Sequence, residues 1–439
     1  MDCFVIEGGH RLQGRLRVNG SKNAALPLMA AALLTDRPVR LRDVPRLADI
    51  ANMRTLLSEL GVESRPEEPD AGGEAPGLTL HTTDGSADHA RYDIVRTMRA
   101  SVCVLGPLLA SRGRARVSMP GGCAIGERPI DLHLRGLEAL GARIELEGGD
   151  IVATAPAGGL RGATIFLGGP FGSTVLGTAN VMAAATRARG TTVIESAACE
   201  PEVVDFARLL RAMGARIEHA GSPRVVVHGV ESLGGADHRV MPDRIEAATY
   251  ACAAAITGGE IVLENCPLDA MLAVTDRLSA IGVGVEPGGP SGDALRATVR
   301  VRGGEALGPT QVTTQPHPGF PTDCQAQFMA LLCHAHGNSV ITEKIFPERF
   351  MHVAELSRMG AQLVRQGSTV VVTGPADLRG APVMASDLRA SAGLVLAALS
   401  ARGETTIRRV YHLDRGYESM ETRLAALGAA IERRDEGRE

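Results

Sequence analysis

One stretch decides the fold: Val204-Asp-Phe-Ala-Arg-Leu-Leu-Arg-Ala-Met-Gly-Ala-Arg-Ile-Glu218. Apolar residues from Val204 to Met213 recur at helical spacing, which predicts an amphipathic helix. Gly214 predicts the end of that helix, and the alternation from Ala215 to Glu218 predicts a strand. The same Leu/Met/Ile-Gly-Ala/Val step occurs six times, at Leu60-Gly61-Val62, Leu140-Gly141-Ala142, Met213-Gly214-Ala215, Ile281-Gly282-Val283, Met359-Gly360-Ala361 and Leu427-Gly428-Ala429.

An alanine-rich apolar stretch lies upstream of each step, and five of the six end in a glycine followed by a strand-like run. Because alanine is small and often fully buried, we expect these stretches to be closely packed core helices. They cover residues 24–34, 100–110, 179–185, 247–256, 326–335 and 390–401.

The repeat predicts α/β units in the order helix, strand, helix, strand. The glycine steps are farther apart than the usual solenoid periods, so each unit is a small subdomain. Three such units make a plausible domain. We therefore expect an α/β fold of two domains with three repeats each, residues 1–21 plus 241–439 and residues 22–240.

Composition and charge exclude several classes of partner. The net charge of −4 gives no global basic field for nucleic acid, and 3% aromatic residues without tryptophan leave no base-stacking platform. No apolar run approaches the roughly 20 residues of a membrane helix, and residues 1–10 show no secretory signal. Eight cysteines without a C-x-x-C pair are typical of reduced thiols. We expect a cytoplasmic protein with no nucleic-acid, membrane or obligate protein partner.

Polar residues gather at two recurring places, the start of the alanine-rich helix and the loop after the strand. Helix starts carry partial positive charge and free N–H groups, so a basic residue there favours an anion shared between the two. Several such sites could converge on one highly anionic set of ligands; the alternative is local pairing or solvation. The helix starts are residues 21–23, 96–99, 243–244, 322–323 and 387–389, and the loops are residues 121–128, 200–202, 346–349 and 414–415.

Cys123 stands apart from the other thiols. It lies in a glycine loop, Pro120-Gly-Gly-Cys-Ala-Ile-Gly-Glu-Arg-Pro129, whereas Cys103, Cys252 and Cys333 fall within alanine-rich stretches. A thiol near a cation in an exposed loop is open to reaction, and inert packing is the alternative. No spacing of His, Cys and Asp suggests a zinc site, so we expect no metal.

Eight strings, in order along the chain, carry a family resemblance. They are Gly20-Ser-Lys-Asn-Ala-Ala-Leu-Pro27, Thr97-Met-Arg-Ala-Ser101, Pro120-Gly-Gly-Cys-Ala-Ile-Gly126 with Arg128-Pro129, Pro242-Asp-Arg-Ile-Glu246, Phe320-Pro-Thr-Asp-Cys-Gln-Ala-Gln-Phe328, Arg349-Phe-Met-His352, Asp387-Leu-Arg-Ala-Ser391 and Asp414-Arg-Gly-Tyr-Glu418. With them the chain resembles, end to end, the UDP-N-acetylglucosamine enolpyruvyl transferases that begin peptidoglycan synthesis. The resemblance implies two inverted, barrel-like α/β domains with the active site between them. It also implies enolpyruvyl transfer from phosphoenolpyruvate to UDP-N-acetylglucosamine without cofactor or metal.

The resemblance assigns roles by position. Asp323 is expected to accept the proton of the sugar 3-hydroxyl, and Cys123 to act as general acid toward the methylene carbon and to bond covalently to phosphoenolpyruvate. The residues expected to hold phosphoenolpyruvate are Lys22, Asn23, Arg128 and Arg415, of which Lys22 and Arg415 join Cys123 and Asp323 in the catalytic set. The expected UDP-sugar contacts are Asn23, Arg99, Arg128, Pro129, Ile130, Asp131, Leu132, Asp323, Ile345 and Phe346, with Arg349, Asp387 and Arg389 lining the site.

Two strings depart from the family pattern. Ser173-Thr-Val-Leu-Gly-Thr178 stands where the family commonly has Ser-Val-Gly-Ala-Thr, and Cys199 replaces an arginine. Both fall on the side expected to hold the nucleotide, so transfer to a different nucleotide or UDP-sugar stays open. The Gly-Gly-Cys loop argues against shikimate 3-phosphate as acceptor. The presence of Cys123 and Asp323 argues against a non-catalytic relative that binds UDP-sugars.

Overall fold

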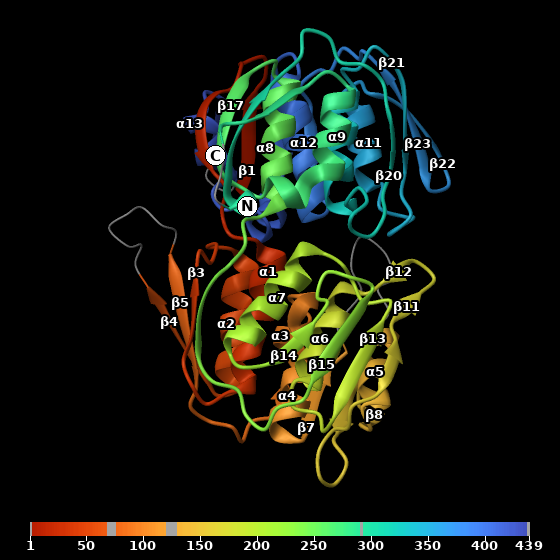
Figure 1. The fold of residues 1–439 in the computed structure, drawn as a ribbon. Helices are drawn as coiled ribbons and strands as arrows, with labels where there is room; N and C mark the ends of the chain where they lie inside the picture. Colours follow the sequence, from red (N-terminus) through yellow and green to blue (C-terminus); the bar gives the residue numbers. More distant parts are fainter. Residues whose placement is uncertain (1, 68–75, 120–129, 290–292, 437–439) are drawn as a thin grey trace. The chain divides into compact units, whose positions relative to one another are not determined.

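The computed structural model describes residues 2–67, 76–119, 130–289 and 293–436 (Figure 1). These residues form two units. Unit I comprises the described residues of 2–19 and 242–436, and unit II those of 20–119 and 130–241. Every helix within the described ranges is too short or too polar to cross a bilayer.

Unit II contains three repeats of the order strand, helix, strand, helix, strand, strand. The first is β16 (Ala236–Arg239), α1 (Lys22–Ala30) with η1 (Ala31–Leu34), β3 (Val39–Arg42), α2 (Ala48–Glu59), β4 (Val62–Glu67) and β5 (Gly77–Thr82). The second is β6 (His89–Ala90), α3 (Tyr92–Val95), η2 (Arg99–Val104) with α4 (Leu105–Arg112), β7 (Arg114–Ser118), α5 (Asp131–Ala139), β8 (Arg143–Glu147) and β9 (Asp150–Thr154). The third is β10 (Thr164–Phe166), the ribbon β11 (Gly168–Gly169) and β12 (Gly172–Ser173), α6 (Val175–Ala185), β13 (Thr191–Glu195), α7 (Pro201–Ala212), β14 (Arg216–Glu218) and β15 (Arg224–His228).

Unit I repeats the same order three times. The first repeat is β2 (Gln13–Arg17), α8 (Arg244–Ile256), β17 (Glu260–Cys266), η3 (Leu268–Met271) with α9 (Leu272–Ala280), β18 (Gly284–Pro287), η4 (Ala294–Arg296) and β19 (Ala297–Arg302). The second is β20 (Gln311–Thr313), η5 (Thr322–Cys324) with α10 (Gln325–Leu332), β21 (Gly337–Thr342), α11 (Met351–Arg358), β22 (Gln362–Gln366) and β23 (Thr369–Gly374). The third is β24 (Pro382–Met384), α12 (Leu388–Ser400), β25 (Glu404–Arg408), η6 (Val410–Arg415) with α13 (Met420–Ala426), β26 (Ala430–Asp435) and β1 (Asp2–Glu7).

The six four-stranded sheets of the described chain share one pairing pattern. In each, two strands pair in parallel and two further strands add antiparallel. In four of these sheets an alanine-rich helix joins the two parallel strands, as expected for a crossover connection. The parallel pairs β16–β3 and β17–β2 instead bring together strands from distant parts of the chain. In the β10 sheet, Ile165 lies opposite Ile194 in the parallel pair and Val193 lies opposite Val226 in the antiparallel one. The predicted order of helix, strand, helix, strand was therefore incomplete by two strands per repeat.

Strands from the beginning of the chain complete unit I. Strand β1 pairs antiparallel with both β25 and β26, so that Phe4 lies opposite Ile407 and Arg433. Strand β2 pairs parallel with β17. In Figure 1 the red strand β1 accordingly lies among the green and blue elements of unit I. The early strands thus hold together sheets whose other members all come from the second half of the chain.

The alanine-rich stretches form the buried helices that the sequence predicts. All 13 residues of α8 are buried, and α12 packs against α8 and α10 at the centre of unit I (Figure 1). A Cβ atom built on Gly393 of α12 would lie 2.7 Å from the carbonyl oxygen of Ala326 in α10. In unit II a Cβ on Gly106 of α4 would lie 2.2 Å from the carbonyl oxygen of Asn180 in α6. These distances require glycine, because the helix backbones approach too closely for any side chain.

The glycine steps end the second helix of each repeat, which confirms the sequence prediction. Gly214 has a φ of 106° and donates its N–H to the carbonyl of Arg211 at 2.9 Å, while Ala215 donates to Leu210 at 2.9 Å. This pair of bonds satisfies carbonyl groups that would otherwise have no partner at the helix end. The φ values of Gly61, Gly141, Gly282, Gly360 and Gly428 are also positive.

Candidate active site

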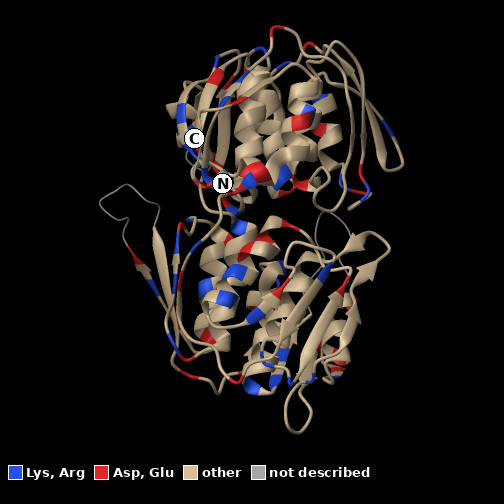
Figure 2. Cartoon of the chain, viewed as in Figure 1, with Lys and Arg blue, Asp and Glu red and all other residues tan. Residues whose placement is uncertain are grey.

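In unit I two of the three alanine-rich helices, α8 and α12, carry acidic caps at their starts. Asp243 accepts hydrogen bonds from the N–H groups of Ile245 (2.8 Å) and Glu246 (3.0 Å), and Asp387 caps α12 in the same way. The helices are tan along most of their length in Figure 2, and their charged residues lie at these starts. Because α8, α10 and α12 pack against one another, their parallel repeats bring the charged starts to one place.

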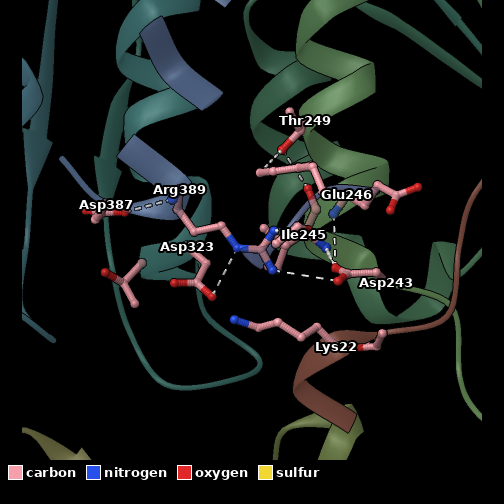
Figure 3. Close-up of polar contacts among 12 residues, drawn as sticks. Lys22, Asp243, Ile245, Glu246, Thr249, Asp323, Asp387 and Arg389 are labelled. Atoms are coloured by element: carbon pink, nitrogen blue, oxygen red, sulfur yellow. Dashed lines mark hydrogen bonds and ion pairs between the residues drawn. The ribbon is translucent and has the colours of Figure 1, made fainter. Parts of the chain in front are cut away.

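Arg389 lies at the centre of this cluster, with a side chain only 2% exposed (Figure 3). Its Nε is 3.7 Å from Oδ2 of Asp323, and its Nη2 is 3.6 Å from Oδ2 of Asp243. The guanidinium also lies over the ring of Tyr417, 5.0 Å from its centroid. Burial opposes the charge, but Tyr417, Asp243 and Asp323 outweigh burial and raise the pKa of Arg389. The group is therefore a permanent buried cation.

The Nε and Nη2 atoms of Arg389 make these ion pairs but no hydrogen bond within the described part of the chain. Buried N–H donors are normally satisfied. Two charged donors aimed into a cluster of acidic residues are suited to a ligand that brings hydroxyl or anionic oxygens.

A second buried arginine flanks Asp323. Nη1 of Arg349 donates to Oδ1 of Asp323 at 2.8 Å and to the hydroxyl of Thr322 at 3.1 Å, and Nη2 lies 3.7 Å from Oδ1 of Asp387. Burial alone would raise the pKa of Asp387, but Arg349 and the amides of Ala390 and Arg389 lower it. Burial opposes the charge of Arg349 too, yet Asp323 and Asp387 raise its pKa.

Asp323 is the accessible member of this group. Its side chain is 25% exposed, whereas that of Arg349 is 5% exposed. Each carboxylate oxygen of Asp323 faces one guanidinium group, Oδ1 that of Arg349 and Oδ2 that of Arg389. A carboxylate held at both oxygens has a fixed orientation, which suits a general base that must meet a hydroxyl group in one geometry.

Three other residues predicted for the site belong to unit I, namely Ile345, Phe346 and Arg415. Ile345 and Phe346 follow strand β21, and their backbone N–H groups donate to Glu343 at 2.8 and 2.9 Å. The Phe346 ring lies 6.0 Å from the guanidinium of Arg349. Arg415 is the last residue of η6 and is half-buried.

In unit II, Lys22 and Asn23 form the first turn of α1. Ser21 caps this helix by accepting the N–H of Ala24 at 3.3 Å. Nζ of Lys22 donates to Oδ2 of Asp49 in α2 at 3.1 Å, and both side chains are buried. The sequence argument expected cations at helix starts to share a ligand anion, but here a protein carboxylate supplies part of that negative charge.

The segments that carry the remaining predicted residues of unit II are linked through the buried side-chain amide of Asn180. Arg99 begins η2, and Ile130, Asp131 and Leu132 begin α5. Asn180 of α6 bonds to both segments: its Nδ2 donates to the carbonyl of Val102 at 2.8 Å and lies 2.9 Å from Nδ1 of His133. Burial and the charge of Arg99 lower the pKa of His133 to about 3, so this ring is neutral.

Sequence reasoning missed Asp49, Asn180 and Glu343, which hold predicted site residues in place. Cys123, Arg128 and Pro129 were predicted and lie outside the described residues. Within the described ranges, no group of three or more His, Cys, Asp or Glu side chains is arranged to hold a metal ion.

Comparison with known proteins places the chain in a family. The family model of EPSP synthase (3-phosphoshikimate 1-carboxyvinyltransferase) matches residues 6–424. UDP-N-acetylglucosamine 1-carboxyvinyltransferase of Gluconacetobacter diazotrophicus is 54% identical over 433 residues, 99% of each chain. The enzyme of the same name from Maricaulis maris is 53% identical over 438 residues, 100% of each chain. The chain belongs to the UDP-N-acetylglucosamine 1-carboxyvinyltransferase family.

Solved structures support the family's fold for this chain. The enolpyruvyl transferase NikO from Streptomyces tendae aligns with a TM-score of 0.86 at 28% identity, covering 98% of each chain. An EPSP synthase from Acinetobacter baumannii aligns with a TM-score of 0.75 at 20% identity, covering 99% of this chain and 100% of its own. The second likeness concerns the fold alone. The α/β fold of six repeats expected from the sequence is confirmed.

Proposed function

We propose that the chain transfers the enolpyruvyl group of phosphoenolpyruvate to the 3-hydroxyl of UDP-N-acetylglucosamine and releases phosphate, the first committed step of peptidoglycan synthesis. The observation that carries this proposal is full-length identity of 54% and 53% to two enzymes named for that activity. The buried arginines around Asp323 supply chemistry of the kind that the reaction needs.

In the proposed reaction, Asp323 accepts the proton of the sugar 3-hydroxyl while that oxygen attacks carbon 2 of phosphoenolpyruvate. Cys123 donates a proton to the methylene carbon, which gives a tetrahedral adduct. The adduct then loses phosphate and a proton from the new methyl group, which restores the double bond. Support for the base comes from the orientation of Asp323 between Arg349 and Arg389. Because a carboxylate is a weak base toward a hydroxyl group, Asp323 acts in concert with the attack rather than before it.

Binding roles follow the same assignment. Lys22, Asn23, Arg128 and Arg415 hold the carboxylate and phosphate of phosphoenolpyruvate, and Arg349, Asp387 and Arg389 line the site. The residues proposed to contact the UDP-sugar are Asn23, Arg99, Arg128, Pro129, Ile130, Asp131, Leu132, Asp323, Ile345 and Phe346. The two described units are proposed as the two domains of the enzyme.

We also propose that the reaction takes place in the cytoplasm and needs no cofactor or protein partner. The seven cysteines of the described chain are all free, which is typical of proteins in a reducing compartment.

The test is phosphate release from phosphoenolpyruvate with UDP-N-acetylglucosamine, before and after treatment with fosfomycin, which alkylates the loop cysteine of this family. Release that fosfomycin abolishes supports both the reaction and the role of Cys123, and a Cys123→Ser variant should resist alkylation. Shikimate 3-phosphate and other UDP-sugars serve as acceptor controls. Release with another acceptor, and none with UDP-N-acetylglucosamine, would refute the proposed acceptor and direct attention to residues 173–178.

A further inference from the structure

Glu343 directly follows strand β21, and its side chain is fully buried. Four groups donate hydrogen bonds to its carboxylate. Oε1 accepts from the hydroxyl of Thr314 at 2.6 Å and from the N–H groups of Ile345 at 2.8 Å and Phe346 at 2.9 Å. Oε2 accepts from the hydroxyl of Thr322 at 2.8 Å. This set satisfies a charge that would otherwise be costly to bury.

The donors belong to segments that hold proposed substrate contacts. Ile345 and Phe346 are themselves proposed contacts of the UDP-sugar, and Thr322 immediately precedes Asp323. Thr314, in turn, accepts the N–H of Lys344 at 2.9 Å, which closes the turn on its other side. One buried carboxylate therefore connects the 345–346 loop to the segment that carries the proposed base.

Thr322 also connects Glu343 to Arg349, the arginine that orients Asp323. The Thr322 hydroxyl donates its one hydrogen bond to Glu343. Its oxygen can then only accept further hydrogen bonds, and it accepts one from Nη1 of Arg349 at 3.1 Å. The same Nη1 donates to Oδ1 of Asp323 at 2.8 Å. Because Arg349 can only donate, the Thr322 hydroxyl needs an acceptor for its own proton, and the Glu343 carboxylate is that acceptor.

Only a carboxylate can accept hydrogen bonds from all four of these donors. A carboxylate accepts at both oxygens, whereas an amide of the same size accepts at one atom and donates at the other. With glutamine at this position, either Thr322 or the 345–346 amides would face a donor. If Glu343 served only to close the turn, the hydrogen bonds to Oε1 would be sufficient. The bond from Thr322 to Oε2 would then not be needed.

We infer that Glu343 is a positioning residue for the acceptor, which holds the Ile345–Phe346 loop and Asp323 in one fixed arrangement while touching no substrate itself. The identity of the acceptor rests on the proposed function. The role of Glu343 in the arrangement rests on the hydrogen bonds alone.

The test compares Glu343→Gln and Thr322→Val with Thr322→Ser, which keeps the hydroxyl and is the matched control. Steady-state phosphate release gives kcat and KM for each substrate, and hydrogen exchange reports the Ile345 and Phe346 amides. We expect Glu343→Gln and Thr322→Val to lower kcat/KM for UDP-N-acetylglucosamine about tenfold or more. KM for phosphoenolpyruvate should stay within about twofold, and Thr322→Ser should stay close to the wild type. Amide exchange should accelerate in Glu343→Ala, which leaves both amides without this acceptor, and remain unchanged in Thr322→Val.

The outcomes separate the two proposals. A wild-type chain that releases no phosphate with UDP-N-acetylglucosamine contradicts the proposed function, and amide exchange in Glu343→Ala still decides whether Glu343 holds the loop. An active wild type with Thr322→Val at full kcat/KM overturns the inference, as does an equal rise of both KM values. Unchanged exchange at the two amides in Glu343→Ala, which has no acceptor for either of them, overturns it regardless of activity.

Discussion

Asp387 combines two functions that substitution can separate. Its Oδ1 caps α12 by accepting the N–H groups of Arg389 at 2.7 Å and Ala390 at 2.9 Å, and it lies 3.7 Å from Nη2 of Arg349. Asparagine keeps an oxygen for the cap but removes the charge, and alanine removes both. We predict that unit I is most stable in the wild type, less stable in Asp387→Asn and least stable in Asp387→Ala.

The magnitudes follow from the contacts. Asparagine caps as well as aspartate, so the step from asparagine to alanine measures the cap, about 1 kcal/mol. Loss of the charge removes an attraction to the helix start of about 0.3–1 kcal/mol and one partner of Arg349. That arginine keeps Asp323 at 2.8 Å, so the loss stays below the cost of an orphaned buried charge, about 3–5 kcal/mol. We expect about 1–2 kcal/mol for Asp387→Asn and about 2–3 kcal/mol for Asp387→Ala.

The sign of the pH dependence is also fixed. The pKa of Asp387 is lowered in the folded chain, because the effects of Arg349 and the helix amides exceed that of burial. Its stabilising contribution is therefore complete above the unfolded pKa of about 3.9 and is lost as the pH falls through the lower folded value. At pH 7 both variants should show their full loss.

Hydrogen exchange at the Arg389 and Ala390 amides measures the cap locally, and phosphate release measures the site. Loss of about 1 kcal/mol should accelerate exchange about fivefold in Asp387→Ala relative to Asp387→Asn. Both variants should lower kcat/KM, because Arg349 loses a counter-ion. Equal exchange in the two variants would refute the cap, and a fully active, fully stable Asp387→Asn would refute the role of the charge.

Three further predictions concern unit II. Asp49→Asn removes the carboxylate partner of buried Lys22 and should lower kcat/KM for phosphoenolpyruvate about tenfold; an effect confined to the acceptor KM would contradict this. Gly106→Ala places a Cβ 2.2 Å from a carbonyl oxygen and should lower the free energy of unfolding by about 1–3 kcal/mol or more. Gly85→Ala, where a Cβ would lie in open space, should leave stability unchanged. Equal melting temperatures of the two variants would refute the close approach. Because burial lowers the pKa of His133 to about 3, unfolded His133 takes up a proton below about pH 6.5 and stability should fall toward pH 4, less so in His133→Asn; melting scans at several pH values check this.

The repeat was predictable because its signals are local. A glycine with positive φ at the end of a helix, such as Gly214, and a run of alanines each specify structure within a few residues. Among the missed strands, the first strands of five repeats give no such signal. Strands β6, β10, β16, β20 and β24 are two to four residues long, too short for alternation to show. Strand β16 is defined by pairing with β3, which lies far earlier in the chain and places Leu41 opposite His238.

The same distinction applies to the site. Asp323, Arg349, Asp387 and Arg389 stand in strings that resemble a family, and the structure brings them into one cluster. The residues that hold others in place were missed. Asn180 is a single polar residue in an apolar stretch, Glu343 lies between Thr342 and Lys344, and the partners of both come from separate segments. Their importance is a property of three-dimensional contacts, which no spacing in the sequence expresses.

The pairing of β1 has a consequence for biosynthesis. Phe4, Val5 and Ile6 are buried only when β25 and β26 are in place. Ribosomes add about 5–20 residues per second, so this apolar strand waits roughly 20–90 s for its partners. All of unit II is translated within that interval and can fold while the strand at the beginning of the chain still exposes an open edge. Nascent chains should therefore engage chaperones through strand β1 until β25 and β26 have been translated.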